Sequence, residues 1–125
     1  MPSNPLDAYQ DVERATLSGR ELEASVLNKA ATLLIDAKNR WNEADHEASL
    51  DTALKYNQRI WSFFQVEVSS EENPLPVEIK RNILSLSSFV DRRTFDIMAY
   101  PEPDKLNMLI NINHNIAAGL RGDKG

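Results

Sequence analysis

Apolar residues recur at helical spacing along most of this chain, and polar stretches containing proline or glycine separate the runs. In "LDTALKYNQRIWSFF", which begins at Leu50, apolar residues recur every three or four positions and therefore share one face of a helix. The same spacing appears in three other stretches. It predicts four longer helices, over residues 18–41, 50–66, 76–99 and from 104 to a glycine at 119 or 122.

Local signals indicate where these helices begin. Pro5 suits the start of a short leading helix over about residues 4–15, and "SGRE", from Ser18, has the pattern of a capping box. Asp104 is placed to cap the last helix. Helices joined by short turns predict an all-α fold, a helical bundle of four longer helices plus a short N-terminal helix.

Each of the four longer predicted helices has a candidate core face, which is a set of apolar residues at helical spacing. In the helix over residues 50–66 it consists of Leu50, Ala53, Leu54, Ile60, Trp61 and Phe64, and in the last helix of Leu106, Leu109, Ile110, Ile116, Ala117 and Leu120. The helix over residues 18–41 would bury Leu22, Val26, Ala30, Leu33, Ala37 and Trp41, and that over residues 76–99 would bury Ile79, Ile83, Leu86, Val90 and Ile97.

An asparagine lies in the middle of the apolar face of two helices. With a step of about 100° per residue, Asn57 and Asn113 fall at the same angle among their apolar neighbours. The two segments share one pattern at an offset of 56 residues, which reflects either chance or an internal structural repeat. A buried amide without a partner costs roughly 1–3 kcal/mol, so each asparagine should find a hydrogen bond. Either the two amides bond to one another or to nearby backbone and fix how the helices pair, or both face a partner helix.

Three of the helices carry more apolar surface than one buried face requires. The excess consists of methionines and of large aromatic or aliphatic side chains behind the main faces. Either the first two helices cover these side chains, or they form a groove for an amphipathic helix of a partner. The candidate partner-binding residues are Tyr56, Phe63, Leu84, Phe95, Met98, Met108 and Ile112.

Composition narrows the functional classes. A chain of 125 residues suffices for a core, and we expect a single domain over residues 1–125. The net charge of -5 and the scattering of the 14 basic residues argue against binding along a nucleic-acid backbone. There is no cysteine, the opening residues do not resemble a secretory signal, and no apolar run approaches the ~20 residues of a membrane span. We expect a cytoplasmic protein.

The residue pattern gives no sign of catalysis. The two histidines, His46 and His114, have no partner at the spacing of a zinc or di-iron site. The sequence contains neither a glycine-rich phosphate loop nor a nucleophile elbow. Its carboxylate clusters, such as Glu71 with Glu72, fall in predicted loops. We therefore expect no enzymatic activity, no cofactor and no metal.

Three blocks follow one another along the chain: "YNQRIWSFF", "ENPLPVEIKRNILSLSSFVDRRT" and "LININHNIAAGLRG". Together they resemble the FlaF family of flagellar biosynthesis regulators from α-proteobacteria, and the likeness extends to "AYQ" and "SGRELEA" near the start. Two mild departures are Ile60, where leucine is commoner, and Arg93, where histidine is common. The residues assigned to the family's motifs are Asn57, Arg59, Trp61, Asn73, Pro74, Pro76, Asp91, Arg92, Thr94 and Asn113.

Two of these residues also have a structural interpretation. Asn73 would cap the helix that follows it, with Pro74 just inside the first turn. Arg92 would pair either with an acidic group or with neighbours of Asp91 on the helix over residues 50–66, and the sequence does not specify which.

The resemblance implies a non-enzymatic protein that promotes flagellin production and export, binds flagellin as a chaperone and acts opposite FlbT, a regulator of flagellin mRNA. Flagellin's terminal segments are amphipathic helices before export, and the predicted groove would shield their apolar faces. Two alternatives are a regulator that contacts the message directly and an adaptor whose main partner is FlbT or a second copy of the chain. The acidic composition argues against direct contact with RNA. The sequence does not specify the oligomeric state.

Overall fold

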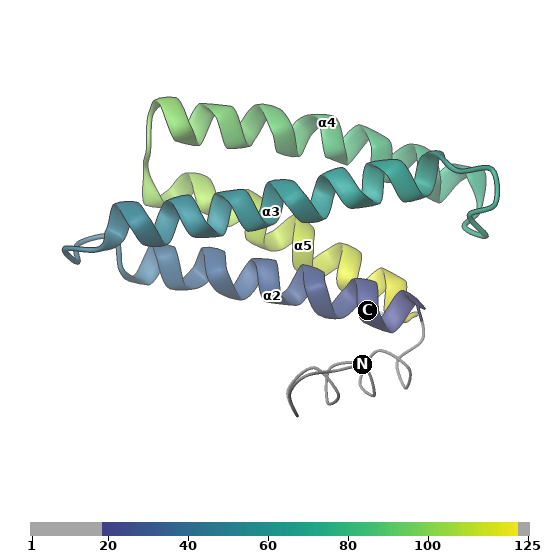
Figure 1. Ribbon diagram of the computed structural model, residues 1–125, viewed down its shortest axis with the longest axis horizontal. Coiled ribbons are helices and arrows are strands. Elements are labelled where there is room, and N and C mark those ends of the chain that lie inside the picture. Colours follow the sequence, from purple (N-terminus) through teal and green to yellow (C-terminus); the bar gives the residue numbers. More distant parts are fainter. Residues whose placement is uncertain (1–18, 123–125) are drawn as a thin grey trace, which may run out of the picture.

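The computed structural model describes residues 19–122, which form helices and connecting turns. The elements are α2 (Gly19–Asn39), α3 (His46–Ser69), α4 (Val77–Ala99), the short 3₁₀ helix η1 (Pro103–Lys105) and α5 (Leu106–Arg121) (Figure 1). Within the described range there is no strand, which confirms the all-α prediction. The expected leading helix over residues 4–15 and the Ser18 side of the capping box lie outside the described residues.

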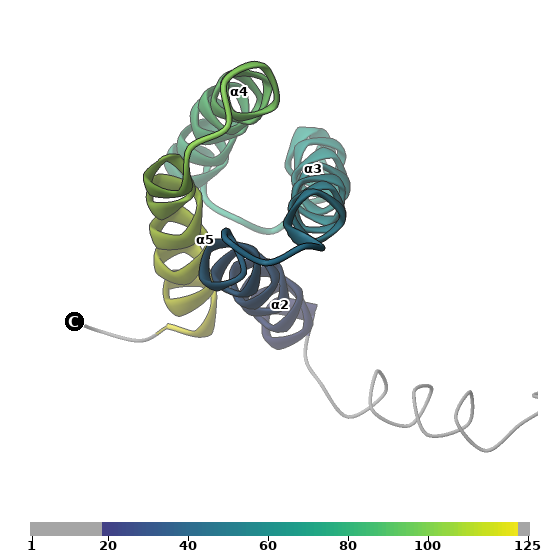
Figure 2. The ribbon, with the colours of Figure 1, turned by 90° about the vertical axis from the view of Figure 1, so that its left-hand side faces the viewer.

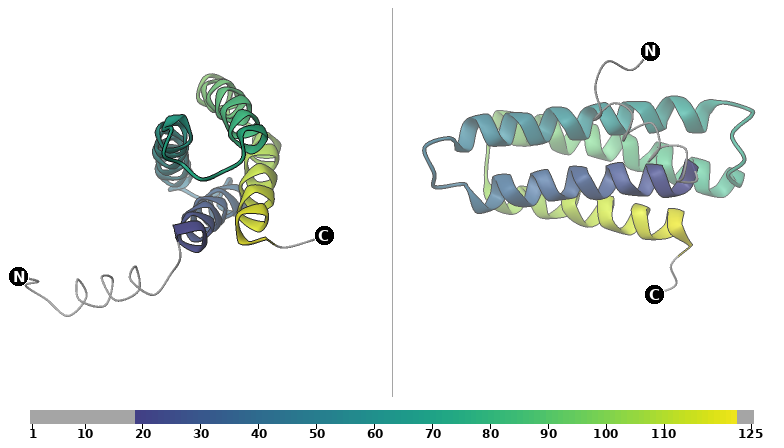
Figure 3. Two further views of the ribbon diagram at one scale, coloured as in Figure 1. Left: turned by 90° about the vertical axis from the view of Figure 1, so that its right-hand side faces the viewer. Right: turned by 60° about the horizontal axis from the view of Figure 1, so that its bottom comes forward.

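The helices run alternately up and down the bundle. In the end-on view of Figure 2, α4, α3 and α2 follow one another around the bundle and α5 is inclined to them. Helix α2 packs most extensively against α5 and next against α3, whereas α4 packs on α3 and touches α5 only lightly. The views in Figure 3 agree that α2 and α5 lie side by side.

Alanines allow α2 and α5 to approach closely. The buried face of α2 consists of Ala24, Leu27, Ala30, Ala31, Leu34 and Ala37. The predicted face was therefore partly wrong: Ala30 and Ala37 are buried, but Leu22, Val26, Leu33 and Trp41 are only half-buried. Small side chains bring two helix backbones together and exclude water between them, so here the alanines form the core and the larger residues lie on its flank.

The buried face of α4 also differs from the predicted line. It consists of Ile83, Ser87, Val90, Thr94 and Ile97. Ile79 is exposed and Leu86 is half-buried. Thr94 is tolerated in the core because its hydroxyl donates to the carbonyl oxygen of Val90 at 2.7 Å.

The helix after the proline-rich loop begins later than the capping prediction required. Asn73 is not the cap of α4, whose N-cap position is Pro76. Instead, the side-chain oxygen of Asn73 accepts a hydrogen bond from the backbone N–H of Leu75 at 3.0 Å, which closes an Asx turn. Because Leu75 precedes a proline, its backbone is excluded from the helical region, and the helix starts only after Pro76.

The ends of α5 give one correction and one confirmation. Asp104 lies inside η1, and the N-cap position of α5 is Lys105 without a side-chain capping bond, so the prediction that Asp104 caps this helix was wrong. At the other end, Gly122 is the C-cap with a φ of 77°. That left-handed conformation favours glycine and ends the helix at one of the two predicted positions.

Candidate binding groove

A chain of buried side-chain hydrogen bonds joins α3 to α5. The Nδ2 of Asn113 donates to the Oδ1 of Asn57 at 2.8 Å, and the indole Nε1 of Trp61 donates to the Oδ1 of Asn113 at 2.9 Å. All three side chains are almost completely buried. The prediction that the two asparagines bond to one another is confirmed, and the alternative that they face a partner helix is wrong.

Trp61 fixes the direction of this chain of bonds. An indole N–H can only donate, so Asn113 must turn its oxygen toward Trp61 and its amide nitrogen toward Asn57. Asn57 then accepts with its oxygen, and its own Nδ2 has no hydrogen-bond partner within residues 19–122. The arrangement sets the pairing of α3 and α5, and it lies in the core, so we assign it a structural role.

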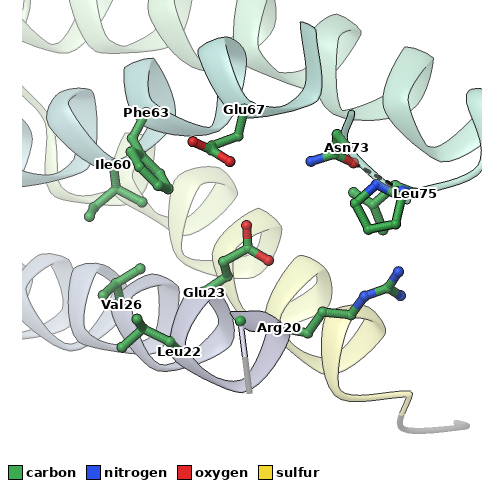
Figure 4. Close-up of a pocket in the computed structure, with 11 residues that line it drawn as sticks. Arg20, Leu22, Glu23, Val26, Ile60, Phe63, Glu67, Asn73 and Leu75 are labelled. Atoms are coloured by element: carbon green, nitrogen blue, oxygen red, sulfur yellow. Dashed lines mark hydrogen bonds between the residues drawn. The ribbon is translucent and has the colours of Figure 1, made fainter. Parts of the chain in front are cut away.

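An open groove lies on the other side of α3, between α3 and α2. It has a volume of about 960 Å³ and is closed at one end by the loop at residues 73–75 (Figure 4). Its apolar lining comes from the first turns of α2 and the second half of α3, as the side chains in Figure 4 show. The apolar side chains that line its two helical walls are Leu22, Val26, Ile60 and Phe63.

Defined contacts hold the loop end of the groove and join α2 to α3 beyond its apolar walls. At the loop end, the Asx turn of Asn73 positions Leu75, whose side chain is buried. Past Val26 and Ile60, the ammonium group of Lys29 lies 5.3 Å from the centroid of the Tyr56 ring. Burial raises the pKa of Tyr56 above its usual value, which fits a ring packed into the α2–α3 seam.

Phe63 is the large aromatic residue of the groove, and its ring packs against a buried aromatic side chain of the same helix. Half of it is solvent-exposed, at 51%, while its ring packs edge-on against Phe64 with 5.8 Å between centroids. Phe64 in turn packs against Trp61 at 6.2 Å. This aromatic row connects the groove to the buried amide bonds, so Phe63 is presented on a rigid base.

Two carboxylates interrupt the apolar lining. In Figure 4, Glu23 of α2 and Glu67 of α3 point toward one another across the groove, while the guanidinium group of Arg20 lies toward Leu75. Burial raises the pKa of Glu23, and the negative charge of Glu67 raises it further, while Arg20 acts in the opposite direction.

The structure divides the seven predicted partner-binding residues among different places. Phe63 lines the groove, Tyr56 contacts Lys29 of α2 and is not part of the lining, and Leu84 and Ile112 are half-buried against the core. Phe95, Met98 and Met108 are exposed in the segments that flank the turn between α4 and α5. That turn lies at the opposite end of the bundle from the α3–α4 loop, which borders the groove (Figure 1). With the exposed Tyr100, these three residues form what we call the distal apolar set.

Sequence reasoning missed most of the groove. Leu22 and Val26 were assigned to the core of their helix, and Ile60 was counted in the main face of α3. In the sequence, Glu23 and Glu67 each lie beside apolar residues on the flank of their helix. That the two carboxylates come close together depends on how α2 and α3 pair. Four further exposed apolar residues were also missed: Val66, Val77, Ile79 and Tyr100.

The remaining motif residues lie in different environments. Pro74 lines the loop end of the groove, and Thr94 is buried in α4. Arg59 and Arg92 are exposed and make no ion pair recorded within residues 19–122, so the expected acidic partner of Arg92 is not found there. Asp91 is half-buried on α4.

Two further features of the described residues concern metal ligands and membrane-spanning helices. Between residues 19 and 122, no group of three or more His, Cys, Asp or Glu side chains is placed to hold a metal ion. None of the helices described over the same range is both long and apolar enough to cross a membrane.

The fold and groove define a small helical protein with a complete core and an open apolar channel beside it. The chain belongs to the FlaF family: the sequence model of that family, described as flagellar protein FlaF, matches residues 5–120. This match confirms the resemblance and makes the chain a flagellar protein. No curated protein and no solved structure matches the chain.

Proposed function

We propose that this protein is a non-enzymatic, cytoplasmic regulator of flagellum biogenesis that binds flagellin and promotes its synthesis and export. In this proposal, the groove between α2 and α3 holds an amphipathic helix of flagellin and covers its apolar face before export. The observation that carries the proposal is the open apolar wall on the flank of the core, where Leu22, Val26 and Ile60 are half-buried and Phe63 is exposed.

Size and shape support a helix as the occupant. A channel between two antiparallel helices offers a third helix the ridges and grooves against which helices pack. The volume of about 960 Å³ is at the upper end of the range for binding clefts. It therefore has room for several apolar side chains from one face of an incoming helix.

The test is binding of purified flagellin to the full-length protein and to two matched variants. Phe63→Asp places a charge in the groove, whereas Val66→Asp places the same charge on the same helix at a residue that is 70% exposed and outside the groove. We expect Phe63→Asp to weaken binding by roughly tenfold or more and Val66→Asp to change it less than about twofold. Equal affinities for the two variants, both folded by circular dichroism, would contradict the proposal.

A second candidate function is that of an adaptor acting with FlbT on the translation of flagellin mRNA. The distal apolar set favours it, because Phe95 (62% exposed), Met98, Tyr100 and Met108 provide an apolar surface away from the groove. Size-exclusion chromatography with light scattering, of the protein alone, with flagellin and with FlbT, separates the two functions. A Phe95→Asp variant that no longer binds FlbT but still binds flagellin would support the adaptor role in addition to capture of flagellin.

A further inference from the structure

We infer that the helix accepted by the groove carries a lysine or arginine that lies between Glu23 and Glu67, followed along the channel by apolar side chains. This inference rests on the proposed function, since it takes the groove to be the capture site. It adds a charge requirement to what would otherwise be a purely apolar surface.

The placement of the carboxylates is the first reason. Glu23 and Glu67 come from opposite walls and point toward one another across the groove (Figure 4). The Val26, Ile60 and Phe63 side chains continue the apolar lining away from them toward the Lys29–Tyr56 contact. A helix lying along the channel would therefore meet an acidic position and an apolar stretch in succession.

The second reason is that the groove's own positive charge does not neutralise its two carboxylates. Arg20 is the basic residue among those that line the groove, and it leaves one negative charge in excess. The half-buried carboxylate of Glu23 is poorly solvated, and the charge of the exposed Glu67 adds repulsion to this cost. An incoming ammonium or guanidinium group would relieve the repulsion between Glu23 and Glu67 and would form hydrogen bonds with both carboxylates. An apolar occupant could do neither.

Charge also distinguishes the partner from other occupants. Residues 1–18 of this chain contain Asp7, Asp11 and Glu13 against the single basic residue Arg14, so that segment would bring more negative charge to Glu23 and Glu67. A second copy of the chain has a net charge of -5 and is repelled as a whole. A helix with basic residues along the edge of its apolar stripe is the complementary occupant.

The probe is a pair of 18-residue synthetic peptides with the same leucine stripe at i, i+3, i+4 and i+7. One peptide carries lysine and the other glutamate along one edge of the stripe. Binding of each is measured by fluorescence anisotropy to the wild-type protein, to a Glu23→Gln/Glu67→Gln variant and to a Glu43→Gln/Glu47→Gln control. The control removes the same charge in the turn before α3 and in its first turn, where Glu47 is about 30 Å from Glu67 at the helical rise of ~1.5 Å per residue.

We expect the lysine peptide to bind the wild type about five- to tenfold more tightly than the glutamate peptide. The Glu23→Gln/Glu67→Gln variant should lose most of this preference, and the control should keep it. Equal binding of the two peptides, or a preference lost equally in both double variants, overturns the inference; the latter result would indicate only general attraction to an acidic protein. Failure of both peptides to bind overturns it as well.

The flagellin-binding experiment distinguishes failure of the charge requirement from failure of the proposed capture site. If Phe63→Asp weakens flagellin binding while the two peptides bind equally, capture in the groove stands and the charge requirement fails. If Phe63→Asp leaves flagellin binding unchanged, the capture site itself is wrong.

Discussion

In the buried α3–α5 interface, the Nδ2 of Asn113 donates a hydrogen bond to the Oδ1 of Asn57 at 2.8 Å, while Asn113 accepts another from Trp61. Asn113 is therefore the central member of the three, and Asn57 is a terminal one with an unused buried N–H donor among the described residues. This asymmetry makes the two asparagines unequal, although their positions in the sequence pattern are equivalent.

The first prediction concerns replacement of each asparagine by leucine. Asn113→Leu leaves the Trp61 indole and the Asn57 amide without partners, and we expect it to lower the free energy of unfolding by roughly 3 kcal/mol. Asn57→Leu leaves only the Asn113 amide nitrogen unpaired and removes an unsatisfied donor, so its cost should be about 1 kcal/mol. Urea unfolding followed by tryptophan fluorescence measures both values. Equal costs would contradict the central role of Asn113.

The double variant sharpens the same comparison. Asn57→Leu/Asn113→Leu leaves only the Trp61 N–H unpaired, and it should be more stable than Asn113→Leu alone. A double variant whose cost is the sum of the two single costs would show that the amides act independently.

The second prediction concerns the pH dependence of stability at Glu23. Burial and then the charge of Glu67 raise the pKa of this carboxyl above its ordinary value of 4.5, so the folded protein binds the proton more readily than the unfolded chain. Stability is therefore lost as the pH rises above 4.5 through the folded-state pKa. Glu23→Gln removes this loss, so the variant should be more stable than the wild type at pH 7, and the difference should shrink as the pH falls through the folded-state pKa and disappear below 4.5.

Thermal unfolding of Glu23→Gln and the wild type at several pH values measures this difference. The charges facing Glu23 are Glu67 on α3 and Arg20 on its own helix. Glu67→Gln should therefore stabilise the protein at pH 7 in the same direction. A Glu23→Gln variant that is less stable at pH 7 and equally so at low pH would argue against a strained carboxyl.

The third prediction concerns two glycines near the end of α5, which should respond in opposite directions to alanine. Gly122 has a φ of 77° and no atom within 4 Å of a built Cβ, so Gly122→Ala should cost about 1 kcal/mol from backbone strain alone. Gly119 lies within α5, also with open space around a Cβ, so Gly119→Ala should add up to about 1 kcal/mol of stability. Thermal unfolding of the two variants under one condition tests this, and shifts of the same sign would be inconsistent with the C-cap assignment.

The sequence predicted the helices well because their signals are local. Proline pairs, polar turns and apolar spacing marked α3, α4 and α5, and the matching positions of Asn57 and Asn113 predicted a bond that the structure contains. Trp61 was missed as the third partner because nothing in its spacing distinguishes a hydrogen-bonded indole from an ordinary core aromatic.

Errors arose where packing between helices decided the outcome. Reading large apolar residues as core placed Leu22 and Val26 inside, whereas the close approach of α2 to α5 buries Ala24 and Ala31 instead. The meeting of Glu23 with Glu67 depends on the antiparallel pairing of α2 and α3, which no local pattern specifies. For the same reason, the sequence could nominate Phe63 and Phe95 as excess apolar residues without showing that Phe63 lines the groove and Phe95 does not.

Hydrogen–deuterium exchange of the protein, alone and saturated with flagellin, tests the central claim most directly. Capture of a helix in the groove predicts slower exchange in the first turns of α2, around residues 20–26, and in α3 around residues 60–67, with the distal apolar set unchanged. Protection confined to residues 95–108, with no change around Val26 and Phe63, would contradict the groove as the place where flagellin binds.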